Sequence, residues 1–254
     1  MSRFKNIIDN PTTSSPTNYN TPSYQSTPQS TPYGNPTGMP PNPGMPQMSP
    51  QQQQAMMQAQ AAWPQVFPKS IIGLEYDGVI NFDRGKPLTS PSEWEPIPGA
   101  LEAIRTMRLK GYKVIILSDQ GGITKGQQTH EQVMAIHQRA MEVFGQAGIF
   151  SIDGFFYAES DLKEDIFAKP NIGMFERAEK ETYAGRTRFK QGGFYVGHRM
   201  KDLKAGLRSG ATPVLVRTGQ GMETEVALKK FSAEKVRKKT KVYNDLLQFA
   251  HSLK

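Results

Sequence analysis

Five apolar runs rich in β-branched and aromatic residues recur in the second part of the chain, and longer stretches of helical period separate them. The runs are SIIGLEY at 70–76, KVIIL at 113–117, DGFFYAE at 153–159, GGFYVG at 192–197 and TPVLV at 212–216. Alternation of this kind is typical of β-α-β units. It predicts an α/β fold of the Rossmann-like class, with a parallel sheet and helices on both sheet faces.

The helical stretches carry apolar residues at spacings of three and four, which predicts that each helix buries one face. The chain ends in KVYNDLLQFAHSL at 241–253, which predicts a short strand followed by a helix. The three predicted apolar faces are Leu101, Ile104 and Met107; Val133, Ile136, Ala140 and Phe144; and Leu203 with Leu207.

Residues 1–68 have a different composition. Of the 19 prolines in the chain, 13 fall between Pro11 and Pro68, among Ser, Thr, Asn, Gly and Gln. Such a segment has too little apolar surface to offset the entropy of ordering. We therefore predict two parts: a disordered or extended Pro/Gln-rich tail over 1–68 and a folded domain over 69–254.

The tail contains one helix signal. Ser49 is placed as an N-cap, Pro50 at the first helical position and Pro64 as a stop, which predicts a helix over 50–62. Two interpretations stand for this helix: it shields Trp63 on the folded domain, or it docks on another chain. The second predicts protein partners, in a homo-oligomeric or viral assembly, bound through the tail.

Several site and partner classes are excluded by composition. The chain has no cysteine, so disulfides and thiolate metal sites are absent. No run has the length of a signal peptide or a bilayer span, which predicts a cytoplasmic protein or part of a particle assembled inside the cell, not a secreted or membrane protein. The basic run KVRKKTK at 235–241 lacks interleaved aromatics, which argues for a solvated face and against a nucleic-acid site.

Polar residues stand where the predicted strands end. The first run ends in Glu75 and Asp77, the second is followed by Ser118 and Asp119, and Lys169 follows the third. The fourth run is followed by HRMKD, which contains His198 and Asp202. Ligand sites of open α/β sheets lie at the carboxyl ends of the strands. These residues are therefore the candidate site.

The order of these motifs resembles the haloacid dehalogenase superfamily of phosphohydrolases. The resemblance covers about residues 71–253 and is carried by DGVIN, by PGALEAIRTMRLKGYKVIILSDQGGITKG, by KPNIGM and by VGHRMKDLKAGLRSGATPVLVRTGQG. It is greatest toward the branch with a minimal cap that contains D,D-heptose 1,7-bisphosphate phosphatase and histidinol-phosphate phosphatase. It implies phosphate monoester hydrolysis and a Mg²⁺ ion held by oxygen ligands.

The resemblance also implies a role for each candidate. Asp77 takes the place of the general acid and base, Ser118 and Asp119 belong to the phosphate-binding loop, and Lys169 neutralises phosphate charge. Glu75 stands in the place of the nucleophilic aspartate. The implied metal set is Glu75, Asp77, His198 and Asp202.

Two positions depart from the family pattern. Glu75 carries one methylene more than aspartate, and His198 replaces the metal-binding aspartate by a nitrogen donor. A shift of a reacting atom by about 1 Å can cost on the order of a hundredfold in rate. The pattern predicts that His198 is a hydrogen-bonded replacement and not a metal ligand.

The segment YAESDLKEDIFAKP at 157–170 is the third departure, because the heptose branch has a zinc loop of three cysteines and a histidine there. This chain has neither residue type in the segment, so we predict no zinc.

These departures favour a catalytically impaired domain without a cofactor, tethered by its tail to a larger assembly. The alternative is an active or weakly active Mg²⁺-dependent sugar-phosphate phosphatase. Polyanion binding through residues 235–241 is a third hypothesis.

Overall fold

The computed structural model describes residues 70–183 and 187–254. The predicted tail, its helix over 50–62 and the boundary at residue 68 lie outside the described residues and stay predictions. Within the described ranges, no helix is long and apolar enough to cross a bilayer.

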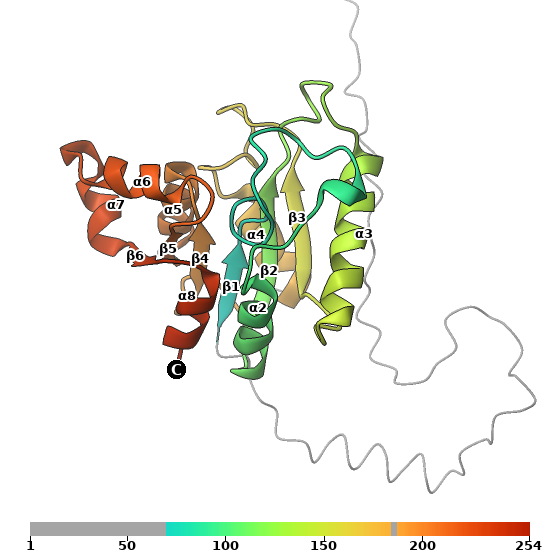
Figure 1. Ribbon diagram of the computed structural model, residues 1–254. Coiled ribbons are helices and arrows are strands. Elements are labelled where there is room, and N and C mark those ends of the chain that lie inside the picture. Colours follow the sequence, from blue (N-terminus) through green and yellow to red (C-terminus); the bar gives the residue numbers. More distant parts are fainter. Residues whose placement is uncertain (1–69, 184–186) are drawn as a thin grey trace, which may run out of the picture. The chain divides into compact units, whose positions relative to one another are not determined.

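All the strands of the sheet run parallel, in the order β3-β2-β1-β4-β5-β6 (Figure 1). The α/β prediction is confirmed, and each predicted run contains a strand. The strands are β1 (Ile71–Leu74), β2 (Lys113–Asp119), β3 (Gly154–Ala158), β4 (Phe194–Gly197), β5 (Thr212–Val216) and β6 (Lys241–Tyr243).

The helices follow the strands along the chain and cover the sheet. Their bounds are α2 (Ala100–Leu109), α3 (His130–Gln146), α4 (Gly173–Tyr183), α5 (Met200–Ser209), α6 (Gly221–Leu228), α7 (Glu234–Lys239) and α8 (Leu246–Ser252), with short 3-10 helices η1 (Pro91–Glu93) and η2 (Phe231–Ala233). The basic run at 235–241 is therefore mostly the short helix α7, and its Lys and Arg side chains are exposed, as expected of a solvated face.

Successive residues of a strand point to opposite faces of the sheet and pack into two separate hydrophobic cores. Ile72 of β1 belongs to the cluster formed with α2, α3 and α8, while Ile71 belongs to the cluster formed with α4 and α5. Both faces of the sheet are therefore buried, which explains why the strands read as continuous apolar runs. A third cluster joins Leu215 of β5 to Leu203, Leu228 and Val236 of α5, α6 and α7.

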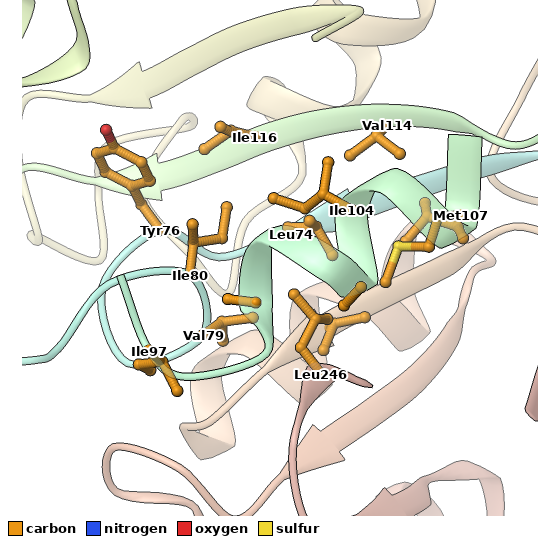
Figure 2. Close-up of a cluster of buried hydrophobic side chains, with 14 of the residues drawn as sticks. Leu74, Tyr76, Val79, Ile80, Ile97, Ile104, Met107, Val114, Ile116 and Leu246 are labelled. Carbon is orange, nitrogen blue, oxygen red and sulfur yellow. The ribbon is translucent and has the colours of Figure 1, made fainter. Parts of the chain in front are cut away.

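The larger core lies beneath α2. Figure 2 shows Ile104 and Met107 of this helix beside Leu74 of β1 and Val114 of β2, with Leu246 of α8 below them. All five side chains are at most 2% exposed. This packing fixes the start of the β1–α2 connection, which carries the first candidate residues.

The order of the strands shows at which edge of the sheet the candidate site lies. β1 lies between β2 and β4, and the chain leaves β1 toward β2 on one side and returns to β4 on the other. This is the switch point at which open parallel sheets bind ligands. The candidate residues at the ends of β1, β2 and β4, and Lys169 after β3, consequently meet at one carboxyl edge.

Candidate active site

A cleft of about 330 Å³ opens at this carboxyl edge. Residues from the ends of β1, β2 and β4 line it, together with residues of the β1–α2 and β2–α3 connections. The lining residues used below are Glu75, Asp77, Asp83, Asp119, Gln120, Lys125, Asp161, His198, Arg199 and Lys201.

Glu75 is the first residue after β1, and its backbone N–H still bonds to the carbonyl of Val196 in β4 at 2.9 Å. Its side chain is buried, at 5% exposure. Oε1 accepts hydrogen bonds from the backbone N–H of Tyr76 and the hydroxyl of Ser118, both at 2.9 Å, and Oε2 pairs with the ammonium of Lys169. The carboxylate is therefore fixed on both oxygens.

Lys169 lies in the centre of the site with no exposed side-chain surface. Its Nζ lies 2.9 Å from Oδ1 of Asp202 and donates to the hydroxyl of Tyr195 at 2.8 Å. Burial lowers the pKa of Lys169 to about 8, although Asp202 opposes this shift. Burial alone would raise the pKa of Asp202, but the nearby positive groups, with Lys169 the strongest of them, together hold that pKa below the usual range.

Asp77 stands at the mouth of the cleft, two residues after Glu75. Its oxygens accept from the amide of Asn81 at 2.7 Å and from the amide of Gln120 at 3.4 Å. Burial raises its pKa, while the hydrogen bond from Asn81 lowers it. A carboxyl whose pKa is raised keeps its proton to higher pH, which suits a group that donates a proton to a leaving oxygen.

Ser118 and Asp119 end β2 on opposite sides of the strand. The Ser118 hydroxyl is buried and accepts from Gln120 Nε2 at 2.9 Å. Asp119 accepts from the backbone N–H of Lys169 at 3.2 Å and lies 2.5 Å from Nζ of Lys201. Burial raises the pKa of Asp119 to about 6, against the effect of Lys201. Both side chains therefore hydrogen-bond or ion-pair with other residues of the protein.

His198 connects three loops. Its Nδ1 accepts the backbone N–H of Gln220 at 2.8 Å, and its carbonyl accepts the hydroxyl of Thr224 at 2.8 Å. The ring packs directly on Gly78 and Gly219, where an added Cβ would lie 2.6 Å and 2.3 Å from ring atoms. Burial lowers the pKa of His198 to about 4.

The structure thus brings all seven predicted residues to one edge. Sequence reasoning missed four others that contact them: Gln120, Tyr195, Arg199 and Lys201. The sequence offered a signal for three of these, because Gln120 is two residues from Ser118 along one strand side, and Arg199 and Lys201 lie within the HRMKD motif. Nothing in the sequence marked Tyr195 as a site residue, because it is one aromatic residue in the apolar run of a predicted strand.

Family comparison agrees with this geometry. Residues 76–206 match the model of the family described as polynucleotide kinase 3 phosphatase, and residues 166–248 match the model described as HAD-hydrolase-like. D-glycero-beta-D-manno-heptose-1,7-bisphosphate 7-phosphatase of Pseudomonas putida is 32% identical over 181 residues, which cover 71% of this chain and 97% of that protein.

The chain belongs to the haloacid dehalogenase superfamily. Within it, the chain falls in the D,D-heptose 1,7-bisphosphate phosphatase branch, as the motifs predicted. The enzyme of the same name from Neisseria meningitidis is 31% identical over 183 residues, covering 71% of this chain and 92% of that protein.

Solved structures of this branch superpose on the chain. The D,D-heptose 1,7-bisphosphate phosphatase of Bordetella bronchiseptica, complexed with magnesium and phosphate, has a TM-score of 0.64 and 27% identity, over 72% of this chain and 96% of that one. The Burkholderia thailandensis enzyme has a TM-score of 0.51 and 29% identity, over 72% and 97%. The haloacid dehalogenase fold is thereby confirmed.

The donor set of this chain does not fit a magnesium ion. Among the described residues, no three His, Asp or Glu side chains are grouped as metal ligands. Asp202 uses Oδ1 for Lys169 and Oδ2 for the backbone N–H groups of His198 and Arg199. Since Mg²⁺ requires oxygen ligands in near-octahedral geometry, a neutral imidazole in the metal position is a poor substitute.

The segment at 157–170 contributes a charged residue to the cleft and exposes apolar side chains. Asp161 lines the cleft and lies 2.5 Å from Nζ of Lys125 across it. Leu162 and Ile166 are 61% and 64% exposed. The absence of zinc from this segment stays a prediction.

Proposed function

We propose that the domain is a slow phosphatase for sugar phosphate monoesters, in which Glu75 is the nucleophile. The observation that carries this proposal is the meeting of Glu75, Ser118 and Lys169 in a buried cluster, with Asp77 beside it at the cleft mouth. The similarity to heptose-bisphosphate phosphatases over nearly their whole length supports the substrate class. It also favours the hydrolytic alternative over the impaired module that the sequence departures suggested.

The chemistry follows from two carboxyl groups with different tasks. An oxygen of Glu75 attacks phosphorus, the bond from phosphorus to the sugar oxygen breaks, and Asp77 gives its proton to that oxygen. Water then attacks the phosphorus of the glutamyl phosphate and passes a proton to Asp77. The bond between phosphorus and Glu75 breaks, which releases inorganic phosphate and restores both residues.

The surrounding residues prepare these steps. The ammonium of Lys169 and the hydroxyl of Ser118 contact the Glu75 carboxylate and are placed to hold phosphoryl oxygens when a substrate enters. Gln120 contacts both Ser118 and Asp77, so it couples the phosphate-binding loop to the proton donor. Preorganised donors of this kind stabilise the charge that develops in the transition state.

The rate should be low for a geometric reason. The additional methylene moves the carboxylate by about 1 Å relative to an aspartate, and such a displacement can cost on the order of a hundredfold. The contacts of Glu75 with Lys169, Ser118 and Tyr76 also have to rearrange before an oxygen attacks. Because the donor set does not fit Mg²⁺, no step above uses the ion seen in the Bordetella enzyme.

A second candidate function, a non-catalytic binding module, is favoured by the full engagement of Glu75 by internal partners. On this hypothesis the tail over 1–68 recruits the domain to an assembly. The structure describes no residue of that tail, so this role and the identity of any partner stay predictions.

Phosphate release from glucose 6-phosphate and from D-glycero-beta-D-manno-heptose 1,7-bisphosphate tests the proposal. We expect slow turnover by the wild type, loss of turnover in Glu75→Gln and Asp77→Asn, and full retention in Glu181→Gln. Glu181 is an exposed carboxylate paired with Arg177 on α4 and is a matched control. Wild-type turnover equal to that of Glu75→Gln would reject the phosphatase and favour the binding module.

A further inference from the structure

The imidazole of His198 has a defined protonation pattern. The backbone N–H of Gln220 donates to Nδ1 at 2.8 Å, so Nδ1 has to be the unprotonated nitrogen. A proton on Nδ1 would place two donors against each other. The neutral ring therefore carries its proton on Nε2, and the hydrogen bond to the loop after β5 selects this tautomer.

The ring cannot turn to exchange the two nitrogens. Gly78 and Gly219 pack on it so closely that a Cβ at either position would lie within 3 Å of ring atoms. The backbone of His198 is also fixed, because its N–H bonds to Asp202 at 3.1 Å and its carbonyl accepts from Thr224 at 2.8 Å. His198 is among the residues that line the cleft, although it is only 1% exposed. Since Nδ1 is held by the loop, Nε2 is the ring nitrogen left without an assigned partner among the described residues, and we take it as the one that would meet a ligand.

Four of the five carboxylates that line the cleft pair with a lysine or an arginine. Asp83 lies 2.6 Å from Arg199, Asp119 lies 2.5 Å from Lys201, and Asp161 lies 2.5 Å from Lys125. Glu75 pairs with Lys169, and Asp77 accepts hydrogen bonds from two amides. A carboxylate in place of His198 would add an unpaired negative charge that repels phosphate unless a cation were bound. The neutral imidazole removes this requirement.

We propose that the cleft binds the phosphoryl group without a divalent cation, and that the Nε2–H of His198 donates to a phosphoryl oxygen in place of the metal. His198 is thus a phosphate-binding residue of a metal-independent site. This inference deepens the proposed function, on which it rests for the substrate class. It makes a separate statement about binding that does not depend on turnover.

Titration with inorganic phosphate in the presence of EDTA tests the site, read by calorimetry and by imidazole nitrogen NMR. We expect saturable binding that Mg²⁺ does not strengthen. The His198 ring should show a protonated Nε2 before phosphate is added, and its Nε2 signal should shift as phosphate binds. His137, a buried imidazole stacked on Phe155 with ring centroids 3.8 Å apart, is the internal control and should not shift.

His198→Asn is the matched variant, because its amide oxygen can keep the bond from Gln220 while the donor at Nε2 is lost. Loss of a hydrogen bond to a charged group should weaken phosphate binding on the order of 10- to 100-fold. His137→Asn should bind phosphate as the wild type does. If the His198 variant does not fold, the NMR titration of the wild type still decides.

The outcomes separate this inference from the proposed function. Metal-free phosphate binding with a shifted His198 signal, but without turnover, would reject the phosphatase and leave the site standing. Turnover or phosphate binding that appears only with Mg²⁺, or a His198 ring protonated on Nδ1, would overturn the metal-independent site.

Discussion

Nζ of Lys169 lies 2.9 Å from Oδ1 of Asp202, and neither side chain has any exposed surface. The pair joins the loop after β3 to the first turn of α5 across the carboxyl edge of the sheet. Asp202 also accepts the backbone N–H groups of His198 and Arg199 and so holds the entry to α5. A single carboxylate therefore supports both the charge of Lys169 and the position of His198.

Removal of this carboxylate should strongly destabilise the fold. Asp202→Ala leaves the buried ammonium of Lys169 with Glu75, and with Asp119 at 4.0 Å, as its remaining anions, and it frees two backbone donors. Loss of one partner of a buried pair typically costs about 3–5 kcal/mol. Urea unfolding should show a loss of this size. The control is Glu181→Ala, which breaks an exposed pair on α4 and should cost less than about 0.5 kcal/mol.

Equal losses in the two variants would mean that the Lys169–Asp202 pair contributes no more than a surface ion pair. In that case Asp202 acts only as a cap of α5, and the central role assigned to the pair is wrong.

Stability should fall as the pH drops from about 6.5 to about 4. Burial lowers the pKa of both His198 and His137 to about 4, from the ordinary value of 6.5. Between these values the unfolded chain binds more protons than the folded one, so acid favours unfolding. Each histidine costs no stability above pH 6.5, and the loss grows as the pH falls, to at most about 3.4 kcal/mol below pH 4.

Urea unfolding at pH 7.5 and pH 4.5 measures this effect. We expect His198→Asn and His137→Asn each to show a smaller difference between the two pH values than the wild type. Asp119 works in the opposite direction, because its pKa is raised to about 6, but its contribution cancels when variants are compared with the wild type. An unchanged difference in both variants would show that these imidazoles are protonated in the folded state.

The fold and seven residues of the candidate site could be predicted from the sequence because they depend on local patterns. The period of the apolar runs predicts β1 to β6, and the strand ends place Glu75, Ser118 and Lys169 at one edge. The hydrogen bond from the backbone of Gln220 to His198 could not be predicted from such local patterns. It joins residues 22 positions apart through a backbone group, and no residue type at position 220 is needed to form it.

The ion pairs of the carboxylates along the cleft could not be predicted from the sequence either. Lys201 and Asp119 are paired only because α5 and β2 meet at the switch point. From the motifs alone, the longer side chain of Glu75 and the nitrogen donor of His198 favoured an impaired domain. The geometry shows Glu75 and Asp202 sharing the ammonium of Lys169 and Asp119 paired with Lys201, while Asp77 is hydrogen-bonded to two amides.

Gly219→Ala should disturb the site through His198. Gly219 has a φ of +55°, and a Cβ there would lie 2.3 Å from Nδ1. Gly126 is the matched control, since its φ is +66° but nothing lies within 4 Å of its added Cβ. The left-handed conformation costs each alanine variant about 1–2 kcal/mol. Only Gly219→Ala should lose a further ~1–3 kcal/mol from overpacking and also weaken phosphate binding.

Urea unfolding and phosphate calorimetry on both variants check this prediction. If Gly126→Ala and Gly219→Ala lose the same stability and bind phosphate equally, the contact between position 219 and the imidazole does not fix the ring.

The double variant Glu75→Asp with His198→Asp should gain Mg²⁺-dependent hydrolysis. His198→Asp returns an oxygen ligand and a negative charge to the metal position, and Glu75→Asp returns the nucleophile to the shorter reach of the superfamily. Asp77, Ser118 and Lys169 are retained for the other roles. Neither single change should suffice, because His198→Asp leaves the carboxylate displaced and Glu75→Asp leaves the metal position without its oxygen.

Phosphate release by the four proteins, each with Mg²⁺ and with EDTA, measures the gain. The wild type should hydrolyse slowly and equally under both conditions, whereas the double variant should be faster by about a hundredfold with Mg²⁺ and inactive with EDTA. Calorimetry should show Mg²⁺ binding only where residue 198 is aspartate. If the wild type already turns over rapidly with Mg²⁺ and stops with EDTA, glutamate is a fully competent nucleophile and His198 accepts the metal after all.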